Sequence, residues 1–177
     1  GLIYFEQGRF EDAINEYITV IKLKPDHSEA HNNLGAIYFR QGRLDEAMKE
    51  YMFALKLNPD YTEAYYNLGL IYFKQGRLDE AIKEYMYALK LNPDYTQVYN
   101  SLGKVYFNKG EIDKAIEHFQ GALRLKPDYL EAHYNLGLVY LKTGLRHKAE
   151  EEFKTVLKLR PDFTPARETL KSINRER

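Results

Sequence analysis

The chain has 177 residues, of which 44% are hydrophobic, 26 are basic, 26 are acidic and none is cysteine. The lack of cysteine excludes a disulfide framework, thiol catalysis and thiolate metal sites, and it is compatible with the cytoplasmic location that we expect. The balanced charge argues against nucleic acid or an anionic membrane surface as the main partner, and no apolar run is long enough to insert into a membrane.

The chain is expected to open with a partial repeat. Gly1 aligns with Gly35, Gly69 and Gly103, which stand in the middle of expected helices. We therefore expect residues 1–27 to form a truncated repeat, with further residues upstream that would carry any targeting signal.

A strict period of 34 residues runs through the rest of the chain. It is marked by five prolines, Pro25, Pro59, Pro93, Pro127 and Pro161. Such a period indicates one structural unit copied in series. We expect full repeats at residues 28–61, 62–95, 96–129 and 130–163.

Each full repeat is predicted to contain two amphipathic helices. In the repeat at residues 62–95, apolar residues recur at helical spacing over residues 64–72 and again over residues 78–89. Gly69 and Ala81 are small residues within these helices. A glycine inside a helix costs about 1 kcal/mol relative to alanine, so we expect the two helices to approach closely there.

The junctions between helices carry turn signals. The spacing from Asp26 to Glu29, which later repeats reproduce, resembles a capping box and predicts that each such Asp opens a first helix. A glycine in the left-handed conformation is expected to end each first helix. These glycines are Gly8, Gly42, Gly76, Gly110 and Gly144.

Residues 164–177 are predicted to form a polar capping helix, which solenoids need to stay soluble. Ala166, Leu170 and Ile173 keep the apolar positions of a first helix. In the preceding repeat, Arg146 and Glu150 stand at positions that are apolar elsewhere, and we expect both to face water. The carboxyl end is expected to be a natural terminus.

The order of residues within a repeat resembles that of the tetratricopeptide repeat. In the repeat at residues 62–95 the matching residues are Tyr65, Leu68, Gly69, Tyr72, Ala81, Tyr85 and Pro93. The family's usual tryptophan is replaced by another ring, at His31, Tyr65, Tyr99 and His133. The resemblance implies an all-α fold, a right-handed α-solenoid of helix-turn-helix repeats that extends over residues 1–177 as a single solenoid.

Nothing in the sequence predicts catalysis. The five histidines form no His-Glu-x-x-His motif and no pair at metal-ligand spacing, and the glycines form no phosphate-binding loop. His31 and His133 occupy the aromatic position of the repeat, where a ring packed between helices is a better interpretation than a metal ligand. We expect no enzyme activity, no metal and no cofactor.

One face of each first helix is not needed for packing. At about 100° per residue, Tyr66, Asn67, Leu70, Phe73 and Lys74 fall on one arc, opposite the residues of the repeat signature. The resemblance implies that this arc faces a concave groove. Over all repeats, the expected peptide-binding residues are Asn32, Asn33, Tyr66, Asn67, Phe73, Lys74, Asn100, Ser101, Lys104, Tyr134 and Asn135.

A column of asparagines is the most specific feature of this arc. An amide offers both a donor and an acceptor, which suits the backbone of a peptide of any sequence. The column of Asn33, Asn67 and Asn135, broken by Ser101, is similar to the asparagine ladder that lines the repeat arm of O-linked N-acetylglucosamine transferases. The alternative is that these asparagines form hydrogen bonds within or between neighbouring repeats.

These observations predict a non-catalytic protein–protein interaction module that binds an extended or helical peptide segment of a partner. Two alternatives stay open. One is a structural assembly unit that self-associates through the truncated N-terminal end. The other is the substrate-selecting arm of a larger enzyme.

Overall fold

The computed structural model describes residues 2–175, apart from the side chains of Leu2, Glu6 and Asn174, and all regular structure within this range is helical. The expected place of Gly1 in a helix lies outside the described residues. The chain divides into two compact units, residues 1–93 and 94–177. A single solenoid over the whole chain stays a prediction.

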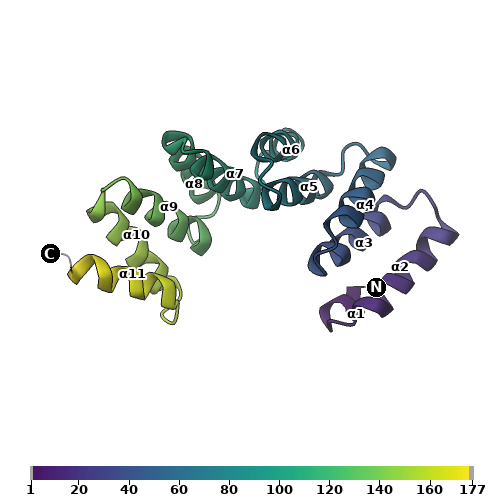
Figure 1. Ribbon diagram of the computed structural model, residues 1–177, viewed down its shortest axis with the longest axis horizontal. Helices are drawn as coiled ribbons and strands as arrows, with labels where there is room; N and C mark the ends of the chain where they lie inside the picture. The colour runs from purple at the N-terminus through teal and green to yellow at the C-terminus, as the bar shows by residue number, and fades with distance from the viewer. Residues whose placement is uncertain (1, 176–177) are drawn as a thin grey trace. The chain divides into compact units, whose positions relative to one another are not determined.

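Each unit is a series of helices joined by short turns (Figure 1). The helices of the first unit are α1 (Leu2–Glu6), α2 (Phe10–Leu23), α3 (Ser28–Arg40), α4 (Leu44–Leu57), α5 (Thr62–Lys74) and α6 (Leu78–Leu91). The helices of the second unit are α7 (Thr96–Lys109), α8 (Ile112–Leu125), α9 (Leu130–Lys142), α10 (Arg146–Leu159) and α11 (Thr164–Arg175). None of the described helices has the length and apolar character needed to cross a bilayer.

The helices pair as the 34-residue period predicts. In the first unit α3 packs on α4 and α5 on α6, and in the second α7 packs on α8 and α9 on α10. A glycine with φ between 72° and 78° ends the first helix of each pair, where another residue would be strained. The predicted left-handed conformation is confirmed at Gly8, Gly42, Gly76, Gly110 and Gly144.

The close approach of paired helices is confirmed at the glycine in the middle of each first helix. A Cβ atom added to Gly69 would lie 2.4 Å from Cε1 of Tyr85, and one added to Gly103 would lie 2.6 Å from Cε1 of Phe119. The same contact joins Gly35 to Tyr51 and Gly137 to Phe153. All four rings are almost fully buried, so each of the four full repeats has a glycine and an aromatic ring in contact at its centre.

The predicted capping boxes are wrong. The N-cap residues are His27, Tyr61, Tyr95 and Tyr129, each one position after the expected Asp. The Asp instead belongs to the turn, where the backbone N–H of Asp60 donates to the Asn58 side chain at 3.1 Å. At the first of these caps, the Nδ1 atom of His27 accepts a hydrogen bond from the N–H of Ala30.

The last helix packs against the core of the second unit. Ala166 is fully buried and Ile173 is 3% exposed, and both belong to the apolar core that α9 and α10 also form. Arg146 is exposed, as expected. The prediction for Glu150 is wrong, because this residue is only 5% exposed. Its Oε2 atom lies 3.6 Å from Lys154 Nζ. It stands on α10, which packs against both α9 and α11.

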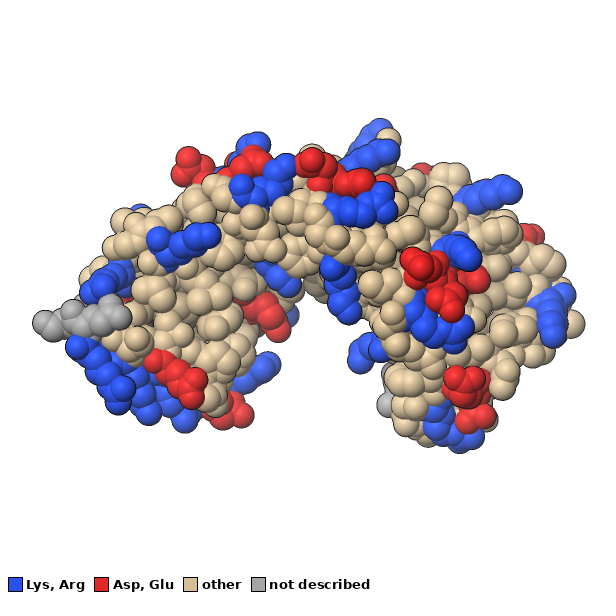
Figure 2. Space-filling model, in the orientation of Figure 1, with Lys and Arg blue, Asp and Glu red and all other residues tan. Residues whose placement is uncertain are grey.

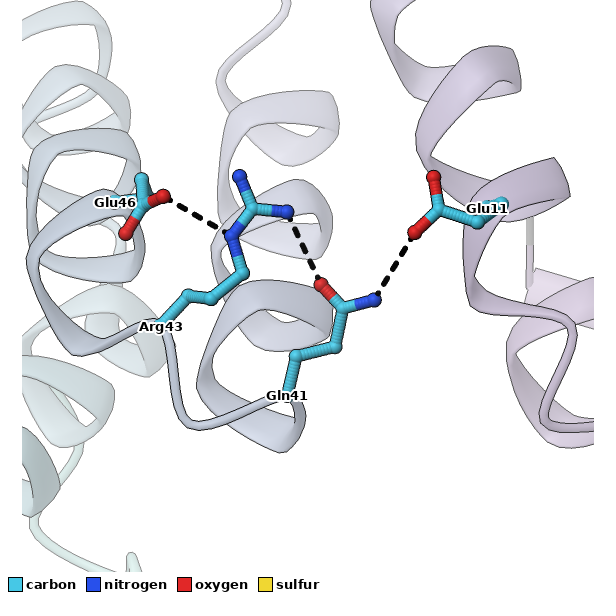
Figure 3. A network of polar contacts seen from close by, with 4 residues as sticks. All are labelled: Glu11, Gln41, Arg43 and Glu46. Carbon is cyan, nitrogen blue, oxygen red and sulfur yellow. Dashed lines mark hydrogen bonds and ion pairs between the residues drawn. The ribbon is translucent and has the colours of Figure 1, made fainter.

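A chain of polar contacts joins the first two repeats at their turns (Figure 3). Gln41 Nε2 donates to Glu11 Oε1 of α2 at 3.4 Å, and an Nη atom of Arg43 donates to Gln41 Oε1 at 3.3 Å. Arg43 Nε also donates to Glu46 Oε1, at 3.0 Å. At the matching positions of α8 and its preceding turn the two charges are exchanged, and Lys114 Nζ lies 2.6 Å from Glu111 Oε2. The turn therefore accepts an ion pair in either order.

Candidate peptide-binding surface

In the first unit, the predicted arc brings aromatic rings and a cation together on α3 and α5. Lys74 is exposed, and its Nζ atom lies 5.0 Å from the ring centroid of Phe39 in the preceding repeat. Phe73 and Tyr66 are half-buried, and the Tyr66 ring lies 5.9 Å from that of Tyr85. Both rings are therefore partly accessible to a ligand.

The asparagines of the first unit bond between neighbouring repeats. Asn67 Nδ2 donates to Asn32 Oδ1 at 3.1 Å. Asn32 is only 7% exposed, and it also forms a hydrogen bond with Tyr61, whose pKa burial raises to about 12. Burial likewise raises the pKa of the Tyr17 hydroxyl, and a hydrogen bond to Asn33 opposes that rise. The alternative left open by the sequence, bonding between repeats, is therefore observed.

The second unit repeats this arrangement on α7 and α9. Asn135 Nδ2 donates to Asn100 Oδ1 at 2.9 Å, and Asn100 is 8% exposed. Ser101 is also buried, whereas Lys104 is exposed. Tyr134 is half-buried between the rings of Phe153 and Phe163, and Lys142 of the last full repeat lies 4.7 Å from the Phe107 ring.

The hydrogen bonds between repeats use only part of the hydrogen-bonding capacity of Asn67 and Asn135. A side-chain amide has two N–H donors and a carbonyl with two lone pairs. Asn67 and Asn135 each use one N–H on the preceding repeat, and both stay partly exposed. A second N–H and the carbonyl are thus held in a fixed direction at the surface. By contrast, Asn32, Asn100 and Ser101 expose little that a ligand could contact.

The acceptor role of Asn32 and Asn100 is a feature that the sequence analysis missed. The spacing of asparagines in the sequence does contain a signal for this acceptor role. Asn67 and Asn135 each stand 35 residues after an asparagine, whereas Ser101 stands 35 residues after Tyr66. An amide donor therefore occurs where an amide acceptor precedes it in the neighbouring repeat.

A hollow of about 450 Å³ opens beside Asn33 in the first unit. Its lining combines apolar side chains with polar ones that can accept or donate hydrogen bonds, and Tyr17, Glu29 and His27 belong to it. Concave sites that combine apolar walls with a few polar groups are typical ligand sites. The hollow therefore extends the candidate surface toward the first repeat.

The two histidines at the aromatic position pair with glutamates of the second helix. His31 Nδ1 lies 2.7 Å from Glu50 Oε2, and His133 Nδ1 lies 2.6 Å from Glu152 Oε2. The hydrogen bond to Glu152 raises the pKa of His133, and its Nε2 atom bonds to the carbonyl of Pro127. Among the side chains that the structure describes, no three of His, Asp or Glu cluster in a way that could hold a metal ion. The geometry of both histidines is that of packed, hydrogen-bonded rings.

Comparison with known proteins places the repeats in a family. A family model described as a TPR repeat matches residues 1–42, 35–76, 69–110 and 103–144, and one described as a tetratricopeptide repeat matches residues 130–163. A comparison with curated protein sequences found no match.

Three solved structures are similar to this chain in fold. The crystal structure of MamA is 33% identical, covers 92% of this chain and 95% of its own, and has a TM-score of 0.78. TTC0263, a thermophilic TPR protein of Thermus thermophilus, is 25% identical over 98% of this chain and 94% of its own, with a TM-score of 0.79. YrrB, described as a TPR protein with an unusual peptide-binding site, has a TM-score of 0.75 at 24% identity and covers 96% of this chain and 87% of its own.

The family models together match most of the chain, and the structural matches confirm the predicted all-α fold of helix-turn-helix repeats. Repeats of this kind generally form interaction modules rather than catalytic sites. The narrower resemblance to the repeat arm of O-linked N-acetylglucosamine transferases stays a prediction. This chain belongs to the tetratricopeptide repeat family.

Proposed function

We propose that the chain is a non-catalytic protein-interaction module, and that it binds a peptide segment along the first helices of each unit. The observation that carries the proposal is the state of Asn67 and Asn135. Each amide is held by a hydrogen bond to the preceding repeat and still presents polar groups at the surface. A group that is already fixed in direction loses little entropy when a ligand binds.

The groups around each amide supply the rest of a peptide site. The amide can bond to the peptide backbone whatever its sequence, whereas the half-buried rings of Tyr66 and Tyr134 can contact side chains. Lys74 and Lys104 add positive charge nearby, which favours peptides with scattered acidic residues. The asparagines therefore provide affinity, and the tyrosines provide selectivity.

A panel of peptides tests this proposal. Binders selected from a random peptide display library with the unaltered protein are measured by calorimetry against the double variant Asn67→Ala and Asn135→Ala. Each lost hydrogen bond is expected to weaken binding by about 0.5 to 1.5 kcal/mol, alike for unrelated peptides. Tyr66→Ala and Tyr134→Ala are expected to change which peptides bind best. Asn15→Ala, on an exposed position of α2, is the matched control.

Circular dichroism of each variant separates binding from folding. A double asparagine variant that melts early but binds every peptide normally would show that the amides only join repeats. The peptide site would then lie elsewhere. Light scattering over a concentration series addresses self-association, since a peptide receptor is expected to stay monomeric until its ligand is added.

A further inference from the structure

Two second helices of the first unit expose an unusual stripe of side chains. On α4 it consists of Lys49, Met52, Phe53 and Lys56, and on α6 of Lys83, Met86, Tyr87 and Lys90. Positions i, i+3, i+4 and i+7 lie on one helix face. We call these eight residues the lysine–methionine–aromatic stripe.

The apolar members of the stripe are open to solvent. Met52 is 55% exposed and Met86 49%, while Phe53 is 41% and Tyr87 44% exposed. Exposed apolar side chains that are grouped and rimmed by polar residues mark interaction surfaces. On α6 the stripe also borders a hollow of about 500 Å³, lined by Lys83, Met86, Tyr87 and Lys90.

Each of the two aromatic rings of the stripe packs on another ring, which holds it in place. Phe53 packs on the ring of His31 with the centroids 4.5 Å apart, and Glu50 holds His31 in turn. Tyr87 stacks on Tyr65 at 5.4 Å with an interplanar angle of 16°. Rings held in this way act as rigid anchors, whereas the neighbouring methionines can adapt to the shape of a partner.

The fold does not require this stripe, because helices at the same place in other repeats lack it. The positions of Met86 and Tyr87 are occupied by Gln120 and Gly121 in α8 and by Lys154 and Thr155 in α10. The exposed methionines and rings are therefore a property of α4 and α6, and repeat packing alone does not account for them.

We propose that the lysine–methionine–aromatic stripe is a docking surface for a segment of a partner protein that carries apolar side chains flanked by carboxylates. The methionines and rings of the stripe can pack against the apolar side chains of the segment. On each helix, the lysines at both ends of the set can pair with its carboxylates. Of the acidic residues in the first turns of the two helices, Glu46 pairs with Arg43 and Glu80 with Arg77. This surface belongs to the second helices and is distinct from the candidate surface on the first helices.

The charge of the two helices favours a protein segment over an anionic membrane. Each helix carries three carboxylates and two lysines, a net charge of −1. A bilayer would meet the acidic residues as well as the lysines, which removes the attraction that a polybasic surface provides. Figure 2 shows blue and red side chains next to one another at several places on the visible face of the molecule. A short segment can contact the stripe alone.

The proposal is tested with a peptide display library and three variants. Met52→Gln with Met86→Gln removes apolar contact while introducing the residue that α8 has at this place. Lys56→Glu with Lys90→Glu reverses charge at one end of the stripe. Arg124→Glu is the matched control, because Arg124 is exposed and holds the position of Lys56 and Lys90 on α8.

Selected peptides that use the stripe are expected to be rich in both apolar and acidic residues. Their affinity should fall at least tenfold in the methionine variant and severalfold in the lysine variant, with no change in Arg124→Glu or in the Asn67→Ala and Asn135→Ala variant. A higher salt concentration should weaken the binding of these peptides to the unaltered protein. Circular dichroism should show unchanged helices.

Three results would overturn the proposal. One is a library selection in which no binder loses affinity in the methionine variant. Another is binding to phosphatidylserine vesicles that the same substitutions abolish, which would make the stripe a membrane contact. A third is a dimer in light scattering that Met52→Gln with Met86→Gln dissociates, which would make a second copy of the chain the occupant.

Discussion

Single residues control how closely the helices of a repeat approach. Gly69 shows the balance of two opposing effects. Alanine is favoured over glycine in a helix by about 1 kcal/mol, but its Cβ atom would come within 2.4 Å of the buried Tyr85 ring. Because the ring is packed on all sides, the steric effect is the larger one.

We expect Gly69→Ala to destabilise the protein, by a net of about 1 to 3 kcal/mol, the cost of an overpacked core. Gly69→Leu should cost more. Thermal and urea unfolding measure the loss. Tyr85→Leu on the Gly69→Ala background serves as a test of the cause, because a smaller side chain should recover part of the stability. An unchanged melting temperature in Gly69→Ala would contradict the assigned contact.

A second prediction at this scale concerns pH. The hydrogen bond that the His133 ring donates to the Glu152 carboxylate raises the pKa of His133 above its value in the unfolded chain. The His133 ring therefore binds a proton more tightly in the folded chain than in the unfolded chain, and protonation of the ring stabilises the folded state. This contribution to stability is complete below the usual histidine pKa of about 6.5 and is lost as the pH rises through the raised value.

The melting temperatures of the wild type and Glu152→Gln between pH 5 and 8.5 provide the measurement. The wild type should exceed the variant most at the acidic end, and the difference should shrink toward pH 8.5. His118 responds in the opposite sense, because burial lowers its pKa and its contribution is lost as the pH falls. Since both proteins contain His118, the difference between them isolates His133. A difference that is constant with pH would refute the assignment.

At the scale of the helices, the hydrogen bond from Asn67 to Asn32 joins α3 to α5. Asn67 contributes to both packing and the proposed peptide site, and a double-mutant cycle separates these roles. We expect Asn32→Ala and Asn67→Ala to be coupled by about 0.5 to 1.5 kcal/mol in the free energy of unfolding, as for an ordinary hydrogen bond.

Peptide binding should respond differently from stability in the same set of variants. Asn32 is almost buried, so its loss should affect binding only through the orientation of Asn67. We expect a smaller loss of affinity in Asn32→Ala than in Asn67→Ala. Strictly additive unfolding energies would mean that the amide pair contributes nothing to packing of the two helices.

Much of the arrangement of helices could be predicted from the sequence, because the features concerned are local and repeated. Two sets of glycines recur every 34 residues. The turn glycines have a positive φ, and the glycines in the first helices contact an aromatic ring. The caps could not be assigned in this way. Asp26 and Asp60 have the residue type of a cap, but the turn after each proline places the cap one residue later, at His27 and Tyr61.

The candidate site was less predictable than the helices. Helical periodicity placed Asn67 on an open face, but it does not report which atoms of a neighbouring repeat lie within bonding distance. That information depends on the packing of α3 against α5. Glu150 was misjudged for a similar reason, since its burial depends on helices that pack around α10 and not on its own segment.

At the scale of the whole molecule, the two ends of a repeat series need protection from water. In the second unit α11 supplies it, burying Ala166 and Ile173 against the core of α9 and α10. Terminal repeats with a polar outer face have this role in solenoids. The high share of polar residues on the rest of α11 matches that role.

We expect removal of residues 164–177 to lower the melting temperature of the second unit and to expose its apolar core. Calorimetry and binding of a hydrophobic dye measure the two effects. Lys171→Ala is the control, because this residue is exposed on the same helix and its loss should change neither. A truncated protein with normal melting and no dye binding would show that α11 does not protect the core.

The amide pair also limits how such a chain can lengthen by gene duplication. The glycine–ring contact lies inside one repeat, so any duplicated repeat brings its own core. The bond from Asn67 to Asn32 joins two successive repeats, and asparagine and tyrosine alternate at its acceptor position. A copy of residues 62–95 inserted behind itself would set the copied Asn67 against Tyr66 instead of an amide. A copy of the two repeats 62–129 would give the copied Asn67 the amide of Asn100, whereas the single-repeat copy leaves one donor asparagine without an amide acceptor.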